Sequence, residues 1–306
     1  MTVPVASKLR RAFPEMHLVW AVEKRCAAVV DQESLVTIRH EAPRNEWRKR
    51  RMSPATWADQ LRYYLSLRKQ HFDFGIDLQG HSKTALCLRL SGAKKRLAVK
   101  ATDALSRRLN PVWVAPVTKM HHVERNLACL ESLFPCTSDA APIMPTLQFE
   151  RSNIRERISE KASLVTIMSS AGQPDKAWPI ERWNAVAENL IAAGKTVAFL
   201  GGPGDPRPGV QGALDWVGQL PLEETMAAIA ESELHLSGDT GGGHIAAAYS
   251  IPQLSIFGPT DPEVFRPYSQ SGVVLRRERS TENISIEEVW DAAQRQLEQH
   301  GKTLSH

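Results

Sequence analysis

One stretch constrains the fold of this chain more than any other: residues 237–260, with the sequence SGDTGGGHIAAAYSIPQLSIFGPT. In this stretch an apolar strand runs into a turn of three glycines, and the turn opens an alanine-rich helix. Glycines let backbone N–H groups approach a ligand closely, and a helix N-terminus carries partial positive charge. The stretch therefore predicts a strand, turn and helix unit whose turn can hold an anion such as a phosphate.

Polar residues of this turn are the first candidates for contacts with that anion. Thr240 can donate its hydroxyl, and Asp239 and His244 stand on either side of the glycines 241–243. A simpler interpretation is a glycine-rich turn in which Thr240 or Asp239 caps the helix and His244 lies in its first turn. These residues by themselves leave both interpretations open.

Length and composition indicate a soluble two-domain protein. The chain has 306 residues, of which 42% are hydrophobic, enough for a core in each of two domains. No apolar run reaches the roughly 18 residues that span a bilayer, and the N-terminus MTVPVASKLRR lacks the order of a signal peptide. We therefore expect a cytoplasmic protein.

The cysteines give no sign of a metal site. Cys26, Cys87, Cys129 and Cys136 show neither CxxC pairing nor a Cys/His ligand spacing. They are expected to be reduced thiols, mostly packed as small hydrophobic side chains. No metal and no cofactor is predicted.

Positive charge is concentrated in one segment, although the net charge is only +4. The segment holds Trp47 together with five basic residues, Arg44, Arg48, Lys49, Arg50 and Arg51. Such a cluster favours an anionic partner. A nucleic acid is not expected, because the run is short and no stacking sheet or reader motif accompanies it.

The first half of the chain alternates strand-like runs with amphipathic helices, the pattern of a parallel sheet. The predicted strands are 17–23, 35–40 and 72–80, and the clearest helix is 121–134. A proline-rich stretch of little periodicity, 141–153, is the predicted interdomain linker. The predicted domains are accordingly 1–150 and 151–306.

The second half restarts the alternation. Its predicted elements are strands at 164–168, 196–202, 234–238 and 253–258, a helix at 180–194, and a last helix that begins with Ser285 and Glu288 at capping-box spacing and ends near Gly301. The polar loops 169–179 and 239–243 both follow carboxyl ends of strands, where ligands bind in open α/β sheets. We therefore expect the two loops to share one crevice.

In the first of these loops, Lys176 can bring a point charge to a diphosphate, while Trp178 and Pro179 anchor the start of the next helix. A solvated loop lysine is the alternative for Lys176, and taken alone it is the more ordinary one.

Together these motifs resemble the lipopolysaccharide heptosyltransferases, which move heptose from ADP-heptose to the inner core of lipopolysaccharide. The resemblance covers nearly the whole chain. It is carried by DTGGGHIAAA, IPQLSIFGPTDP and KAWP in the second half, by IDLQG at 76–80 and HHVERN at 121–126 in the first, and by the basic segment.

The resemblance implies the α/β fold called GT-B, with two facing Rossmann-like domains that contain parallel sheets. The first domain is expected to bind an anionic, lipid-linked acceptor (Kdo-lipid A), and the second a nucleotide-sugar donor, ADP-heptose. The implied reaction is an inverting displacement at the anomeric carbon, at the cytoplasmic face of the inner membrane, with peripheral contact to that membrane.

The resemblance also assigns residues. The expected donor site comprises Lys176, Asp205, Asp239, Thr240, Gly241, Gly242 and His244. The expected acceptor site comprises Arg44, Arg48, Lys49, Asp77, Gln79, His122 and Arg125, of which the last four have equally probable structural roles.

The catalytic base is not identified. Family members place it in a Gly-Asp loop after a first strand, and this chain begins at the following helix, with Pro4 in its first turn and Val5, Leu9 and Phe13 on its inner face. The family's first strand and its aspartate are thus expected to be absent, and Asp239 is one candidate to replace that base.

A second departure from the family lies between the strand at 196–202 and residue 213. The connection GPGDPRPGVQG is too rich in proline and glycine for a helix, although parallel crossovers prefer one. Asp205 is either the acidic contact to the nucleoside or a turn residue before Pro206.

Two alternatives to an active heptosyltransferase stay open, the first because of these departures and the second because the phosphate site indicates a diphosphate but neither the hexose nor the base. One is a family member that binds a nucleotide sugar or an anionic glycolipid without turnover. The other is a GT-B transferase or hydrolase that uses another nucleotide sugar.

Overall fold

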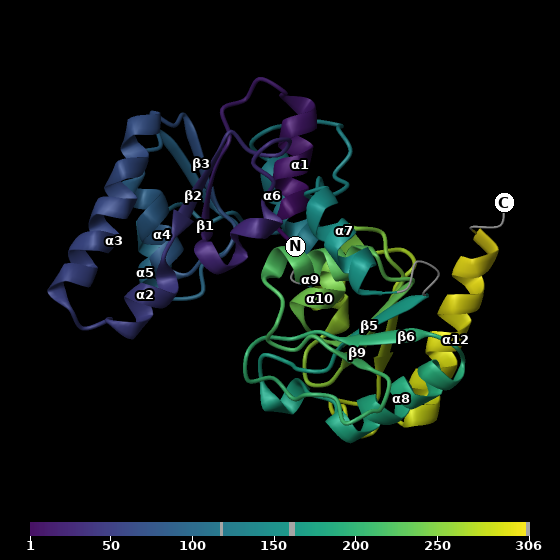
Figure 1. Cartoon of the computed structure of the whole chain (residues 1–306). Coiled ribbons are helices and arrows are strands. Elements are labelled where there is room, and N and C mark those ends of the chain that lie inside the picture. The colour runs from purple at the N-terminus through teal and green to yellow at the C-terminus, as the bar shows by residue number, and fades with distance from the viewer. Residues whose placement is uncertain (117–118, 159–162, 304–306) are drawn as a thin grey trace. The chain divides into compact units, whose positions relative to one another are not determined.

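The computed structural model describes residues 1–116, 119–158 and 163–303. The chain divides into two compact units, residues 2–143 and 144–306 (Figure 1). Within the described ranges, no helix has both the length and the apolar character needed to cross a membrane.

The first unit contains two pairs of parallel strands. Strand β1 (Val19–Glu23) pairs with β2 (Ile38–Ala42), and β3 (Phe74–Asp77) pairs with β4 (Lys95–Ala98). The first pair aligns Val19 with Ile38, and the second aligns Phe74 with Lys95. The parallel strands predicted for this half are confirmed, and they form two separate sheets in the described residues.

Helices accompany these strands. They are α1 (Val3–Ala12), α2 (Arg44–Lys49), α3 (Pro54–Ser66), α4 (Ser82–Leu90), α5 (Ala104–Leu109) and α6 (His122–Glu131), with 3₁₀ turns η1 (Lys24–Val29) and η2 (Leu67–Gln70). Helix α1 packs on α6 through Val5, Leu9 and Leu130, all buried. Phe13 was expected on the same face, but it lies just beyond α1, remains 38% exposed and meets Phe134 edge-on.

The second unit is built on one parallel sheet of six strands. Its order is β10-β9-β8-β5-β6-β7, with bounds β5 (Leu164–Met168), β6 (Thr196–Phe199), β7 (Leu214–Asp215), β8 (Leu234–Gly238), β9 (Gln253–Phe257) and β10 (Val273–Arg276). The chain runs from β5 outward to β7 and then returns to the other side of β5 with β8. Strands β5 and β8 therefore flank the point where the strand order reverses, which is where open α/β sheets bind ligands.

Helices cover both faces of this sheet. They are α7 (Gln148–Arg157), α8 (Ile180–Ala192), α9 (Leu222–Ala230), α10 (Gly241–Ala248), α11 (Pro262–Phe265) and α12 (Ile286–Thr303), with the 3₁₀ turn η3 (Pro174–Lys176). Trp183 and Leu190 of α8 pack with Val289 of α12 in one core, and Ile154 of α7 packs with Ala228 and Ala246 in another. The predicted capping box of α12 forms, because Ser285 and Glu288 each accept the other's backbone N–H.

The predicted linker at 141–153 is wrong from residue 148 onward, where α7 begins. The segment carries many charges, so its helical periodicity is weak. Tertiary contacts stabilise the helix: Ile154 is fully buried, and Arg151 and Arg155 both pair with Glu231. These contacts attach α7 to the second unit, which begins at residue 144.

The unusual connection after β6 is confirmed. Residues 200–213, all within the described range, contain no helix, and β7 nevertheless pairs parallel with β6. The expectation for the cysteines is only partly met: Cys129 is buried, Cys87 and Cys136 are intermediate, and Cys26 is exposed.

Candidate functional site

The two polar loops of the second unit meet at the carboxyl edge of its sheet. Lys176, from the loop after β5, donates to Asp239, directly after β8, with an Nζ to Oδ2 distance of 2.9 Å. The hydroxyl of Thr260, after β9, donates to the same oxygen at 2.7 Å. The two loops thus lie side by side at this edge, as expected, and Thr260 is a further member of the cluster that the sequence had not indicated.

Lys176 is held by a buried anchor. The next residue but one, Trp178, is 2% exposed, donates its indole N–H to the carbonyl of Ile284 at 3.1 Å, and packs edge-on against Trp183. Thr281 donates to the carbonyl of Ala177 at 2.8 Å. The anchoring role predicted for Trp178 is confirmed, and Lys176, 22% exposed, is more enclosed than a solvated loop lysine.

The three glycines at the start of α10 serve two purposes. A Cβ on Gly242 would stand 2.6 Å from Nε2 of His235, and a Cβ on Gly243 would stand 3.0 Å from the hydroxyl oxygen of Ser255. Both positions therefore face the sheet and let α10 pack closely on it. Only Gly241 is open, with no atom within 4 Å of its Cβ position. The prediction that all three glycines allow a ligand to approach the backbone is therefore wrong for Gly242 and Gly243.

Thr240 is the residue that precedes α10, and its hydroxyl makes no capping bond to the helix. That hydroxyl instead points to the sulfur of Met168 at 3.5 Å. The structure therefore contradicts the interpretation in which the side chain of Thr240 caps the helix. His244 lies in the first turn of α10 and is half-buried.

Below α10 lies a buried polar layer that sequence reasoning missed. His235 is fully buried in β8, and its Nδ1 lies 2.9 Å from the hydroxyl of Thr166. Because burial disfavours the charged imidazolium, the pKa of His235 falls to about 3. The sequence LHLSG did contain a signal, since the polar residues His235 and Ser237 alternate with Leu234 and Leu236 along the strand.

Asp205 has a defined role in the loop after β6. Its Oδ2 accepts the backbone N–H of Gly202 and the hydroxyl of Ser170, both at 2.7 Å. The turn interpretation is therefore observed, and the carboxylate also joins this turn to the loop that carries Lys176. A nucleoside contact by Asp205 stays a prediction.

In the first unit, Asp77 organises the loop that follows β3. Its carboxylate accepts the backbone N–H groups of Gln79 and Gly80 and the hydroxyl of Thr84, each at 2.9 Å. Asp77 is 5% exposed, whereas Gln79 is exposed at the surface. Asp77 thus has a structural role, which was the alternative to contact with the acceptor. Gln79 is accessible to solvent.

A basic cavity of about 280 Å³ lies at the end of β4. Its lining includes Lys100, Arg107, Trp113 and Arg125, of which only Arg125 was predicted. His122, on the same helix as Arg125, is half-buried, and burial together with the charges of Lys100 and Arg125 lowers its pKa to about 4. The imidazole is neutral at pH 7, so the positive charge at this place belongs to the lysine and arginines.

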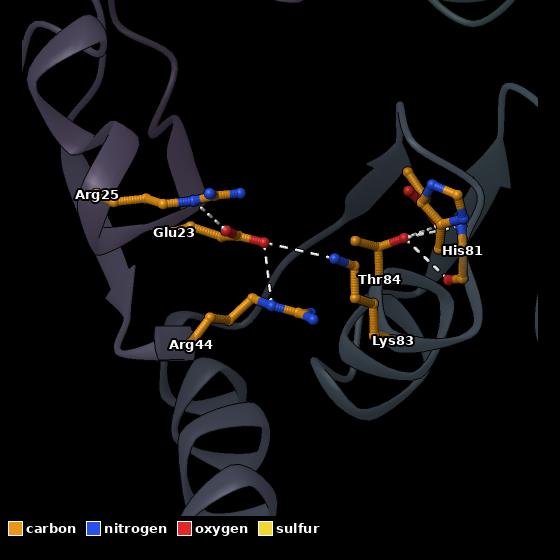
Figure 2. A network of polar contacts seen from close by, with 7 residues as sticks. Glu23, Arg25, Arg44, His81, Lys83 and Thr84 are labelled. Atoms are coloured by element: carbon orange, nitrogen blue, oxygen red, sulfur yellow. Dashed lines mark hydrogen bonds and ion pairs between the residues drawn. The ribbon is translucent and has the colours of Figure 1, made fainter. Parts of the chain in front are cut away.

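The basic segment divides its residues between two environments. Arg48 and Lys49, in the last turn of α2, are exposed. Arg44 begins α2, and its Nε lies 3.0 Å from Oε1 of Glu23 in an ion pair (Figure 2). The structure therefore brings Arg44 to the end of β1, a contact that spacing along the chain does not suggest.

Comparison with known proteins identifies the family. Residues 61–292 match the family model described as glycosyltransferase family 9 (heptosyltransferase). The chain belongs to glycosyltransferase family 9. The chain is similar to lipopolysaccharide heptosyltransferase 1 of Pseudomonas aeruginosa, with 25% identity over 287 residues, which cover 90% of this chain and 79% of the relative.

Solved structures confirm the α/β fold of the GT-B class for this family 9 chain. E. coli heptosyltransferase WaaC with ADP aligns with a TM-score of 0.78 at 20% identity and covers 96% of this chain and 95% of its own. E. coli ADP-heptose lps heptosyltransferase II aligns with a TM-score of 0.80 at 19% identity, covering 98% and 95%. The family 9 chain is thus a glycosyltransferase by family, with a candidate anion site in each unit.

Proposed function

We propose that this family 9 glycosyltransferase transfers heptose from ADP-heptose to the Kdo-lipid A inner core of lipopolysaccharide. The observation that carries the proposal is the convergence of Lys176, Asp239 and the N-terminus of α10 at the reversal point of the second sheet. A lysine charge and a helix N-terminus both favour a diphosphate there. The similar E. coli heptosyltransferase WaaC has been solved with ADP and with ADP-2-deoxy-2-fluoro heptose, which supports this choice of donor.

On the donor side, Lys176 and the free N–H groups near Gly241 would bind the diphosphate, with Thr240 and His244 beside it. Asp239 already accepts bonds from Lys176 and Thr260, so we assign it the task of holding Lys176 in place and not that of a base. Asp205 would face the nucleoside from the neighbouring turn.

On the acceptor side, exposed Arg48 and Lys49 together with Arg44 would bind phosphate or carboxylate groups. Arg125 belongs to the basic cavity at the end of β4, where Trp113 offers an apolar face to a sugar ring. Gln79 and His122 would be neutral hydrogen-bonding groups. This distribution fits an anionic, lipid-linked acceptor.

In the proposed reaction, an acceptor hydroxyl attacks the anomeric carbon of the heptose. The bond between the anomeric carbon and the acceptor oxygen forms, the bond between that carbon and the diphosphate oxygen breaks, and the proton of the hydroxyl passes to a water molecule. The residues of the donor site would stabilise the charge that develops on the departing ADP. We place this reaction at the cytoplasmic face of the inner membrane, with the protein bound peripherally through its basic segment.

Calorimetric titration with ADP and ADP-heptose, paired with a transfer assay on Kdo-lipid A, tests the proposal. Binding and transfer together support it. Binding of ADP-heptose without transfer to any acceptor would favour the non-catalytic alternative. Turnover of a different nucleotide sugar, with no binding of ADP-heptose, would favour another GT-B activity.

A further inference from the structure

Three cations from three separate elements converge on a single carboxylate in the first unit. Glu23, the last residue of β1, forms ion pairs with Arg25 of η1 at 2.9 Å, Arg44 of α2 at 3.0 Å and Lys83 of α4 at 3.4 Å (Figure 2). The charges of these cations lower the pKa of Glu23 against the opposing effect of burial. Glu23 is therefore ionised at neutral pH, and one negative charge faces three positive ones.

Glu23, Arg25 and Arg44 also border a cavity of about 240 Å³. The lining also contains Lys24 and Glu46, whose charges cancel, so the lining itself has one excess positive charge. Lys83, which pairs with Glu23 but does not line the cavity, raises the excess around Glu23 to two. The cation side chains are accessible, with exposed fractions of 62%, 36% and 35% for Arg25, Arg44 and Lys83, whereas Glu23 is 22% exposed. The excess charge thus lies on the solvent side of the carboxylate.

The dipole of α4 does not favour a lysine at the position of Lys83. Lys83 is the second residue of α4, whose first turn contains no acidic residue. A cation in the first turn of a helix opposes the helix dipole, and a carboxylate there would be favoured by about 0.3–1 kcal/mol. The carboxylate of Asp103 already accepts the backbone N–H of Ser82 at the start of α4, at 3.1 Å, and Lys83 pairs with Glu23 of another element.

Lys83 is also held in place before any ligand arrives. Thr84, its neighbour in α4, donates to Asp77. The backbone N–H of His81 donates to the hydroxyl of Thr84 (Figure 2). Asp77 in turn binds the loop after β3 through Gln79 and Gly80. The predicted IDLQG motif thus fixes the start of α4 and, with it, the backbone position of Lys83.

Hydrogen-bonding capacity remains for a ligand. Arg25 and Arg44 both approach Glu23 through Nε, and among the described residues their terminal amino groups have no other recorded hydrogen bond. Terminal amino groups of arginine match the oxygens of a phosphate, which can accept from two arginines and a lysine at once. A phosphate monoester carries close to two negative charges at pH 7, equal to the local excess.

We propose that Arg25, Arg44 and Lys83 form a subsite for a phosphate monoester of the acceptor, and that Glu23 is the positioning residue that holds the three cations together. The proposal deepens the acceptor side of the proposed function and rests on it. Arg25 and Lys83 are new members of the acceptor site, outside the basic segment.

The test compares a phosphorylated acceptor with the same acceptor after phosphatase treatment. For the wild-type chain, removal of the phosphates should raise the KM for acceptor by about tenfold or more, with the KM for ADP-heptose unchanged. Lys83→Met and Arg25→Met should each raise the KM for the phosphorylated acceptor by about five- to tenfold and leave the KM for the dephosphorylated one unchanged. Arg89→Ala, which removes an exposed cation from the same helix, is the matched control and should behave as wild type.

Inorganic phosphate provides a second arm. It should inhibit competitively against the phosphorylated acceptor in the wild type and lose this effect in Lys83→Met. Inhibition by free phosphate without any preference for the phosphorylated acceptor would identify a site for a free anion and overturn the assignment to the acceptor. Equal use of both acceptors would refute the subsite alone, whereas transfer to neither would refute the proposed function and the subsite with it.

Discussion

Lys176 and Asp239 are 63 positions apart in the chain, and their side chains form an ion pair with an Nζ to Oδ2 distance of 2.9 Å. The pair joins the loops that follow β5 and β8, the two strands at the reversal point of the second sheet. Both partners are largely enclosed, with side-chain exposures of 22% and 11%. A lysine fixed in this way has lost most of its side-chain freedom before a ligand binds, so less entropy opposes binding.

Replacement of this lysine should weaken nucleotide binding. Lys176→Ala removes one charge-assisted contact to the diphosphate, and we expect the Kd for ADP to rise by about 10- to 100-fold in calorimetric titration. Lys195→Ala is the control, because Lys195 forms a similar 2.9 Å pair with Glu233 and is 21% exposed, but precedes β6 at the opposite edge of the sheet. An equal loss of ADP affinity in both variants would contradict the assignment of Lys176.

Alanine substitutions should lower the stability of the protein at the packed glycine of α10, Gly242, but not at the open one, Gly241. Gly242→Ala puts a Cβ at 2.6 Å from His235 and 3.0 Å from the sulfur of Met168, so we expect a loss of about 1–3 kcal/mol in unfolding free energy. Gly241→Ala meets no atom within 4 Å and should change stability by less than about 0.5 kcal/mol. Chemical denaturation of the two variants measures the difference, and similar losses in both would refute the close packing of α10.

Acid should destabilise the fold through His235. Its pKa is about 3 in the folded protein and near 6.5 when unfolded, so below pH 6.5 the unfolded chain takes up a proton that the folded chain does not. Stability from the neutral imidazole is complete above pH 6.5 and is lost as the pH falls toward 3. Between pH 7 and pH 5 this one group should cost about 2 kcal/mol.

His235→Gln, which cannot titrate, isolates that contribution. The difference in unfolding free energy between wild type and variant, measured by denaturation at pH 7 and pH 5, should shrink by the same amount at the lower pH. The half-buried His122, whose pKa is also lowered, remains in both proteins and cancels in the comparison. A pH-independent difference would mean that His235 is protonated or exposed in the folded state.

The exposed cations of α2 should contribute to binding of the acceptor and not to binding of ADP. The double variant Arg48→Ala, Lys49→Ala should leave the Kd for ADP unchanged and raise the KM for an anionic acceptor, with a larger effect at low salt because the contacts are solvent-exposed. The matched control is Lys94→Ala, Lys95→Ala, which removes the same charge at the amino end of β4. A parallel loss of ADP affinity in the first variant would contradict this division of roles.

Local patterns in the sequence determined most elements of the fold. Period-2 and period-3.6 patterns located β5, β8, β9 and α8 to within a few residues, because each buries one continuous apolar surface. These patterns failed for α7, in which Ile154 is the one buried residue. Two of its arginines pair with Glu231, which lies far away in the sequence and comes close only in the folded chain. Charged helices of this kind depend on tertiary contacts, which a local pattern cannot contain.

The sequence also determined the residue types and the edge of the sheet at which the donor site forms, since loops after parallel strands share one edge. Only the tertiary structure decided that Lys176 pairs with Asp239, that Gly242 and Gly243 face the sheet, and that Glu23 gathers Lys83 from 60 residues away. The physical reason is that ion pairs and close packing depend on distances of a few ångströms. The topology sets those distances, whereas spacing along the chain does not.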